Sequence, residues 1–151
     1  MTLYLDASAL VSVIADEPSA RRVFASLRER VELPLISDFS RAEAAAGLAR
    51  LIRTGRRSED MVRAMYRTLD RWALEAAQPV GIGPSDITQA GELVRRHALS
   101  LRTPDAIHIA ATHRLGATLL TLDRGMARAA AALGVPHLNP AEAEAPGKPK
   151  D

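Results

Sequence analysis

The sequence of 151 residues contains no cysteine, and this absence removes several kinds of chemistry. Without thiols the chain has no disulfide, no zinc–thiolate centre and no cysteine nucleophile, and a reducing cytoplasm is the natural compartment. The sequence also lacks an apolar run long enough to cross a bilayer, and no basic segment followed by a long apolar one opens it. We therefore expect a cytoplasmic protein without a signal peptide.

Lysine is nearly absent as well, since the only two lysines are Lys148 and Lys150. Arginine supplies the other positive charges, and the formal net charge is +2. Arginine suits bidentate phosphate contacts better than lysine, although a chain rich in alanine and arginine can also reflect GC-rich coding. The charge is compatible with nucleic-acid binding without being diagnostic of it. Six arginines of a predicted helical pair form either a solvated face or a surface for RNA or a partner: Arg53, Arg56, Arg57, Arg63, Arg67 and Arg71.

Short apolar runs that alternate with amphipathic segments predict an α/β fold. The proportions of hydrophobic (47%) and charged (25%) residues are ordinary, and the length indicates one domain. Strands are expected over residues 3–5, 33–36, 80–82, 117–122 and 135–138. Helices are expected over 7–15, from 19 to about 30, from 37–40 to about 55, from 58 onward, from 85 onward, over 105–115 and over 124–133. Because helices separate the strands, the sheet should be parallel with helices on both faces.

The last residues differ in composition from the rest of the chain. Alanine, glutamate, proline, glycine and lysine dominate residues 141–151, and such a segment cannot bury enough apolar surface to fold. We therefore expect a folded domain over residues 1–140 that is followed by a disordered tail.

Four carboxylates occupy related places in the predicted elements. Asp6 and Asp123 each follow an expected strand, where ligands bind in open parallel sheets. Glu43 and Asp105 lie in the first turns of helices, which begin at the same edge. Four carboxylates in one pocket would repel one another unless a cation neutralised them, and oxygen ligands favour Mg²⁺ or Mn²⁺ over zinc. Such an ion activates water for attack on a phosphodiester.

Each acid also has a simpler interpretation when it is taken alone. Asp6 and Asp123 can cap the helices that follow them, because aspartate is a good N-cap residue. Asp105 can be a first-turn charge that the helix dipole stabilises, and Glu43 can be an ordinary first-turn glutamate. Only the combination of two strand-end and two helix-start acids supports a metal site.

The order and spacing of these residues resemble those of PIN domains, and more narrowly those of the VapC toxins of bacterial toxin–antitoxin pairs. The resemblance extends from about Leu3 to Asn139. It rests on the segments 5–10 around Asp6, 40–43 with Glu43, 103–108 around Asp105, and 120–123. It implies a PIN-like three-layer α/β/α sandwich with a short-stranded, mainly parallel sheet.

The resemblance also implies a function and partners. The protein would be a Mg²⁺- or Mn²⁺-dependent endoribonuclease that hydrolyses RNA by metal-activated water. It would form a homodimer and bind a cognate VapB-like antitoxin whose tail occludes the site. None of the four acids departs from the family pattern. By this resemblance the catalytic, metal-binding acids are Asp6, Glu43, Asp105 and Asp123, and the supporting hydroxyl residues are Ser8 and Thr121.

Three basic residues lie near these acids in the sequence. His108 is one turn after Asp105 and could in principle bind the same ion. Its apolar neighbours favour a hydrogen-bonded histidine of the core, so it is placed outside the predicted site. Arg102 and Arg124 flank two of the acids, a position that suggests contacts with RNA phosphate.

Two other functions are compatible with the sequence. A phosphatase with an aspartate nucleophile at the end of the first strand is one, but such enzymes usually need a second acid two residues on, and Ser8 stands there. A catalytically silent RNA- or protein-binding module is the other, because function resides in the site and not in the fold.

Overall fold

The computed structural model describes residues 1–142, so the disordered tail expected over 141–151 lies almost entirely outside the described residues. A five-stranded sheet forms the middle layer, with the strand order β3-β2-β1-β4-β5. Every pair of neighbouring strands is parallel, as the sequence predicted. The strands are β1 (Leu3–Leu5), β2 (Leu35–Ser37), β3 (Gln78–Val80), β4 (Thr118–Leu120) and β5 (His137–Leu138).

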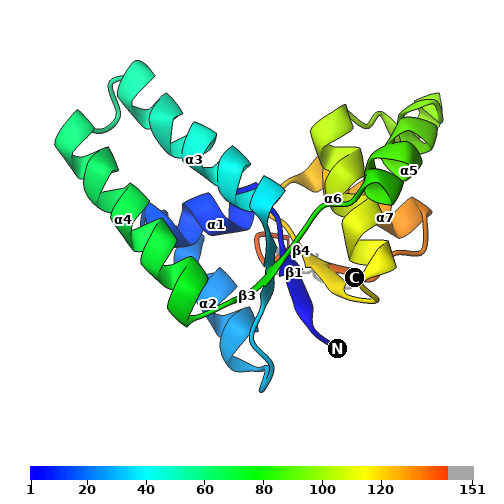
Figure 1. The fold of residues 1–151 in the computed structure, drawn as a ribbon, viewed down its shortest axis with the longest axis horizontal. Coiled ribbons are helices and arrows are strands. Elements are labelled where there is room, and N and C mark those ends of the chain that lie inside the picture. Colours follow the sequence, from blue (N-terminus) through cyan, green and yellow to red (C-terminus); the bar gives the residue numbers. More distant parts are fainter. Residues whose placement is uncertain (143–151) are drawn as a thin grey trace, which may run out of the picture.

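Helices cover both faces of the sheet, and Figure 1 shows α1 to α4 on one side and α5 to α7 on the other. The expected three-layer α/β/α arrangement is confirmed. No helix within residues 1–142 is long and apolar enough to cross a membrane. The helices are α1 (Ala7–Ile14), α2 (Ala20–Arg28), α3 (Asp38–Arg53), α4 (Glu59–Glu75), α5 (Pro84–Val94), α6 (Thr103–Arg114) and α7 (Arg124–Ala132), with a short 3₁₀ helix, η1, at His97–Leu99.

The central strand β1 is buried on both faces. Leu3 and Leu5 pack into the hydrophobic cluster beneath α1 to α4, and Tyr4 between them packs into the cluster beneath α5 to α7. All three are at most 2% exposed. Side chains of a strand alternate between the two faces, so an entirely apolar or aromatic run is typical of a strand covered on both sides. The residue that follows β1 therefore emerges at the centre of the carboxyl edge of the sheet.

The prediction of a strand over residues 80–82 is wrong by two positions, because β3 spans Gln78–Val80. Its register pairs Leu35 with Gln78, and Pro79 is tolerated because β3 is an edge strand. The N–H of Ile82 donates to the Asp38 carboxylate at 3.1 Å, which takes Ile82 out of the strand ladder. A side chain from a distant segment thus ends the strand.

Two helices begin one or two residues earlier than predicted. Helix α5 begins at Pro84, after the N-cap Gly83, and α6 begins at Thr103, after the N-cap Arg102. In each case an aspartate three residues after the cap accepts a hydrogen bond from the cap N–H: Asp86 at 2.8 Å and Asp105 at 3.4 Å. Both helices carry a proline in the first two positions, where the missing N–H costs little. The strands expected at 117–122 and 135–138 are present but shorter, and the strand expected at 33–36 is shifted to Leu35–Ser37.

Candidate active site

Asp6 follows β1 directly and is 1% exposed. Its carboxylate accepts hydrogen bonds from the hydroxyls of Ser8 at 2.7 Å and Thr121 at 2.6 Å. It also accepts from the N–H of Ala9 at 2.9 Å, which makes Asp6 the N-cap of α1. The simple capping interpretation is therefore correct for Asp6, and the cap still leaves its carboxylate at the carboxyl edge of the sheet.

The two hydroxyl residues join the ends of β1 and β4. Ser8 Oγ accepts the N–H of Leu122 at 2.9 Å, and Thr121 Oγ1 accepts the N–H of Asp123 at 3.0 Å. Because both hydroxyls also donate to Asp6, they connect the backbone that carries Asp123 to the Asp6 carboxylate. The ends of the two strands are held in a defined relation by these four hydrogen bonds.

Burial raises the pKa of Asp6 above its ordinary value of 3.8, because removal from water disfavours the charged form. The electrostatic effect of the nearby His108 and the hydrogen bonds from Thr121, Ala9 and Ser8 act in the opposite direction, but burial outweighs them. The protein alone therefore compensates the charge of Asp6 incompletely. A carboxylate in this state fits a site that accepts a cation.

The other strand-end acid, Asp123, is the N-cap of α7. Its Oδ1 accepts the N–H of Met126 at 2.8 Å. The capping interpretation is thus correct here too. One carboxylate oxygen caps the helix, and the cap holds the side chain beside the carboxyl end of β4.

The two helix-start acids are each held by a basic residue. Asp105 Oδ2 accepts from Arg102 Nε at 3.2 Å, and Asp105 is 13% exposed in its side chain. Glu43 Oε2 lies 2.7 Å from Nε2 of His108, and the Glu43 side chain is 31% exposed. Neither pairing was predicted from the sequence.

Arg102 stands among three of the acids. Its hydrogen bond with Asp105 and the charge of Asp105 raise its pKa, and the charges of Asp123 and Glu43 raise it further. Its side chain is 78% exposed. The guanidinium therefore supplies positive charge to the acidic edge from the solvent side.

The structure brings the predicted residues to one edge without closing them into a ligand set. Asp6, Ser8, Thr121 and Asp123 are joined directly, while Glu43 and Asp105 reach the same region through His108 and Arg102. Within residues 1–142 no three histidine, aspartate or glutamate side chains stand close enough together to hold one metal ion as they are placed. Glu43 contacts His108 and Asp105 contacts Arg102, each through one of its two carboxylate oxygens.

Sequence reasoning placed His108 in the core as a hydrogen-bonded histidine, and its 1% exposure agrees with that interpretation. It missed the contact with Glu43, because the two residues are 65 positions apart. The spacing did contain a signal. His108 is three residues after Asp105 on α6, so both side chains project from similar faces of the helix toward the same end of the sheet.

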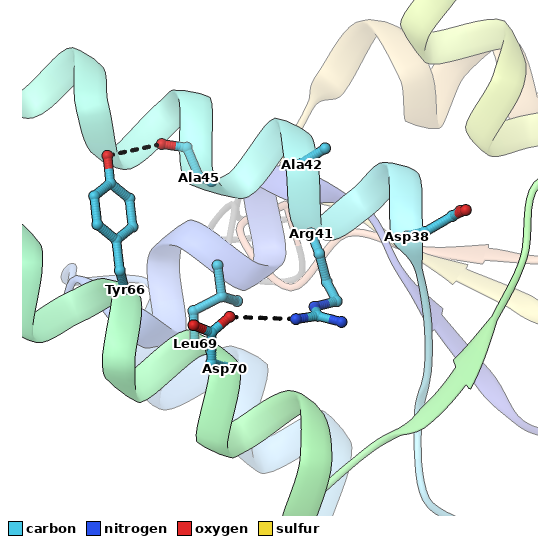
Figure 2. A pocket seen from close by; sticks show the side chains of 7 residues that line it. All are labelled: Asp38, Arg41, Ala42, Ala45, Tyr66, Leu69 and Asp70. Atoms are coloured by element: carbon cyan, nitrogen blue, oxygen red, sulfur yellow. Dashed lines mark hydrogen bonds and ion pairs between the residues drawn. The ribbon is translucent and has the colours of Figure 1, made fainter.

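A separate cleft of about 500 Å³ lies between α3 and α4. Arg41 of α3 pairs with Asp70 of α4 at 3.2 Å, and the Tyr66 hydroxyl donates to the Ala45 carbonyl at 3.5 Å (Figure 2). None of the four predicted acids lines this cleft. The candidate active site is the acidic edge of the sheet and not this hollow.

A parallel α/β/α sandwich with a row of carboxylates at the carboxyl edge of its sheet is the class that the fold and the site define. The family model described as PIN domain matches residues 3–132. The chain belongs to the PIN domain family. No curated protein matches the sequence.

Solved structures of similar fold include FitAcB from Neisseria gonorrhoeae, with a TM-score of 0.71, 20% identity and coverage of 93% of this chain and 99% of that one. VapC20 of Mycobacterium tuberculosis, a sarcin–ricin loop cleaving toxin, has a TM-score of 0.64 and 16% identity over 85% of this chain and 95% of its own. A toxin–antitoxin complex from Klebsiella pneumoniae has a TM-score of 0.63 and 19% identity over 93% and 98%. At these identities the likeness concerns the fold.

Proposed function

We propose that this protein is a divalent-metal-dependent endoribonuclease and the toxin of a toxin–antitoxin pair. The observation that carries the proposal is Asp6, a buried carboxylate of raised pKa at the centre of the carboxyl edge of the sheet. Membership of the PIN domain family supports a nuclease. The sarcin–ricin loop cleaving toxin and the toxin–antitoxin complex among the similar folds support RNA as substrate and an antitoxin as partner.

In this proposal Mg²⁺ or Mn²⁺ is held by the carboxylates of Asp6, Glu43, Asp105 and Asp123, whose oxygens are the ligands that these ions prefer. When bound, such an ion supplies an activated water for attack on the phosphodiester and neutralises the charge that develops.

The residues of the chain have their own tasks beside the ion. The Ser8 and Thr121 hydroxyls hold Asp6 in one orientation through their hydrogen bonds. Arg102 is exposed beside three acids, so its guanidinium can bind a substrate phosphate and draw the RNA backbone toward the edge. Asp123 caps α7 and remains beside the same strand ends.

The proposed partners are a second copy of this chain and a VapB-like antitoxin. The Klebsiella pneumoniae structure is a toxin–antitoxin complex. Its similarity in fold covers 93% of this chain and 98% of the matched chain. An antitoxin segment that occupies the acidic edge would compete with RNA for Arg102. Cleavage by the partner-free protein should therefore be suppressed when the antitoxin is added back.

The decisive test is a cleavage assay on structured RNA with partner-free protein in Mn²⁺, Mg²⁺ and EDTA. We expect cleavage in both metals, none in EDTA, and a loss of at least about 100-fold in Asp6→Asn. Asp60→Asn is the matched control, because Asp60 is exposed in the first turn of α4, and this variant should cleave like the wild type. Cleavage by Asp6→Asn at the wild-type rate would refute the proposal.

A binding module without catalysis is the second candidate, and one observation favours it. Within residues 1–142 the acids do not form a closed metal-ligand set. Thermal unfolding separates the two, since Mn²⁺ should raise the Tm of an enzyme with this site and leave that of a binding module unchanged. A metal-induced rise that is absent in Asp123→Asn supports the enzyme.

A further inference from the structure

We propose that His108 is a positioning residue that holds the carboxylate of Glu43 at the acidic edge and is itself held by Tyr4. The inference deepens the proposed function and rests on it, because the use of Glu43 as a metal ligand belongs to that proposal. His108 lies on α6, Tyr4 on β1 and Glu43 on α3, so the link spans three elements.

The imidazole of His108 is fixed at both nitrogens. Nε2 lies 2.7 Å from Glu43 Oε2, and Nδ1 lies 3.0 Å from the hydroxyl of Tyr4. The rings of Tyr4 and Phe39 pack against the imidazole with centroid separations of 5.8 and 5.2 Å. His108 is 1% exposed while the Glu43 side chain is 31% exposed. The histidine is thus an immobile support for a carboxylate that reaches the surface.

A consistent assignment of protons in this buried network starts from the carboxylate. An ionised carboxylate only accepts, so Nε2 of His108 must donate. With the ring proton on Nε2, Nδ1 accepts from the Tyr4 hydroxyl, which lies 3.0 Å away. Ser37 Oγ lies 2.8 Å from both the Tyr4 oxygen and Ser40 Oγ and can donate to either, and Ser40 donates to the carbonyl of Leu5 across 2.9 Å. Because each hydroxyl has one proton, the hydrogen bonds then run in one direction from Tyr4 through His108 to the carboxylate of Glu43.

Packing alone does not explain why a histidine occupies this buried position. An apolar side chain of similar size would fill the space between Tyr4 and Phe39 without a hydrogen bond, whereas a buried imidazole needs a partner for each polar nitrogen. Glutamate loses more rotamer freedom than aspartate when it is held in place. A bond that restrains Glu43 through Oε2 before the ion arrives lowers that cost.

Mn²⁺ affinity of the purified chain, measured by calorimetric titration, is the first readout. His108→Leu should weaken binding about 10- to 100-fold, the range that partners of metal ligands commonly show. His108→Gln should recover most of that loss, because the glutamine amide can donate from near the Nε2 position. Tyr4→Phe removes only the hydroxyl and should weaken binding about five-fold.

Thr112→Val is the matched control. Thr112 is buried on the next turn of α6, and its hydroxyl donates to the His108 carbonyl at 2.7 Å without touching Glu43. This variant also loses a buried hydroxyl bond and should bind Mn²⁺ like the wild type. An equal loss of affinity in Thr112→Val and Tyr4→Phe would overturn the proposal, because both would then report general damage to α6.

Ring nitrogen NMR of metal-free protein is the second readout and does not depend on nuclease activity. A proton on Nε2 of His108 supports the link to Glu43, and an Nε2 without a proton overturns it. If His108→Leu does not fold, the Mn²⁺ affinities of His108→Gln and Tyr4→Phe test the positioning role. Wild-type protein that binds no Mn²⁺ and cleaves no RNA refutes the proposed function, whereas wild-type affinity in folded His108→Leu refutes only the positioning role.

Discussion

Asp6 and Asp86 are both 1% exposed, yet their pKa values move in opposite directions. Burial raises both, but at Asp86 the hydrogen bonds from Arg114 and Gly83 and the charge of Arg114 outweigh it and lower the pKa. Within residues 1–142 Asp6 has no cationic partner in direct contact, and it accepts hydrogen bonds from two hydroxyls and one backbone N–H. At the scale of the residue, this difference separates an acid that stabilises the fold from an acid that can accept an added cation.

Asp6→Asn should unfold at the same temperature as the wild type or higher at pH 7 in EDTA, because it removes a poorly compensated buried charge. Since the folded-state pKa of Asp6 is raised, its contribution to wild-type stability is greatest below 3.8 and is lost as the pH rises through the raised value. Calorimetry between pH 3 and pH 7 should show this dependence in the wild type and not in the variant.

Bound metal should make the wild type more stable than Asp6→Asn, which reverses the order of stability expected in EDTA. Mn²⁺ at about 100 times its Kd adds about 2.7 kcal/mol to a protein that binds it, and Asp6→Asn should gain almost none of this. A variant that is markedly less stable than the wild type in EDTA would contradict the argument, because the charge would then be needed by the fold itself.

Arg102→Met should tighten Mn²⁺ binding and weaken RNA binding. The guanidinium occupies one oxygen of Asp105 and lies in the field of Asp123 and Glu43, so it competes with an ion for the same charges. We expect a gain of about two- to five-fold in Mn²⁺ affinity, since the pair is exposed, together with a higher KM for RNA. Arg124→Met should change Mn²⁺ affinity less, because Arg124 pairs with Glu142 at 3.8 Å. Equal effects of the two substitutions would argue against a specific role of Arg102.

At the scale of the element, α5 and α6 are joined by an ion pair that the sequence did not reveal. Arg114, the last residue of α6, donates from Nε to Asp86 at 2.7 Å and from its terminal nitrogen to the Gly81 carbonyl at 2.9 Å. Asp86 in turn accepts the N–H of Gly83 and so holds the first turn of α5. The last residue of α6 thus holds the first turn of α5 in place. This contact stabilises the packing of α5 on α6, the helix that carries Asp105 and His108.

Arg114→Met should lower the free energy of unfolding by about 2 kcal/mol. Removing one partner of a fully buried ion pair costs about 3–5 kcal/mol, and the loss here should be smaller because the Arg114 side chain is 38% exposed. The lowered pKa of Asp86 means that its stabilisation is present above 3.8 and is lost as the pH falls through the folded-state value. Urea unfolding should therefore show a difference between wild type and variant at pH 7 that shrinks at pH 3.

Arg95→Met provides the comparison, since Arg95 pairs with Glu92 at the surface with both side chains at least 65% exposed. Its loss should change stability by less than about 1 kcal/mol at either pH. If the two arginine variants were equally stable, the contact between α5 and α6 would not depend on the buried carboxylate.

At the scale of the whole molecule, the described surface includes large apolar side chains that a single chain leaves in water. Val31 is 104% exposed and Leu74 is 84% exposed. Apolar surface of this kind supports association, although single exposed residues are normal in monomers. The proposed homodimer would cover part of this surface.

Light scattering on the purified chain should give a mass of about 32 kDa, twice the 16.2 kDa of one chain, if the proposed dimer forms. The mass should stay the same in Mn²⁺ and in EDTA, because the proposed dimer does not depend on the ion. A mass of 16.2 kDa at the concentrations of the cleavage assay would contradict the dimer and leave the nuclease proposal intact.

The sequence by itself determined the features that depend on neighbouring residues. A continuous apolar run predicts a strand covered on both faces, and a polar residue that ends such a run lies at the sheet edge, so β1, β4 and the places of Asp6 and Asp123 could be predicted. The boundary of β3 could not, because the carboxylate that takes Ile82 out of the ladder comes from 44 residues away.

Only the tertiary structure decided which charges and hydrogen bonds meet. Glu43 and His108 are 65 residues apart, and Asp86 and Arg114 are 28 apart, so no local pattern pairs them. Their pairing follows from the parallel register of β1, β2 and β4 and from the packing of α3, α5 and α6 around that sheet. The physical reason is that burial and partner choice set the charge state of a carboxylate, and both are properties of the folded chain.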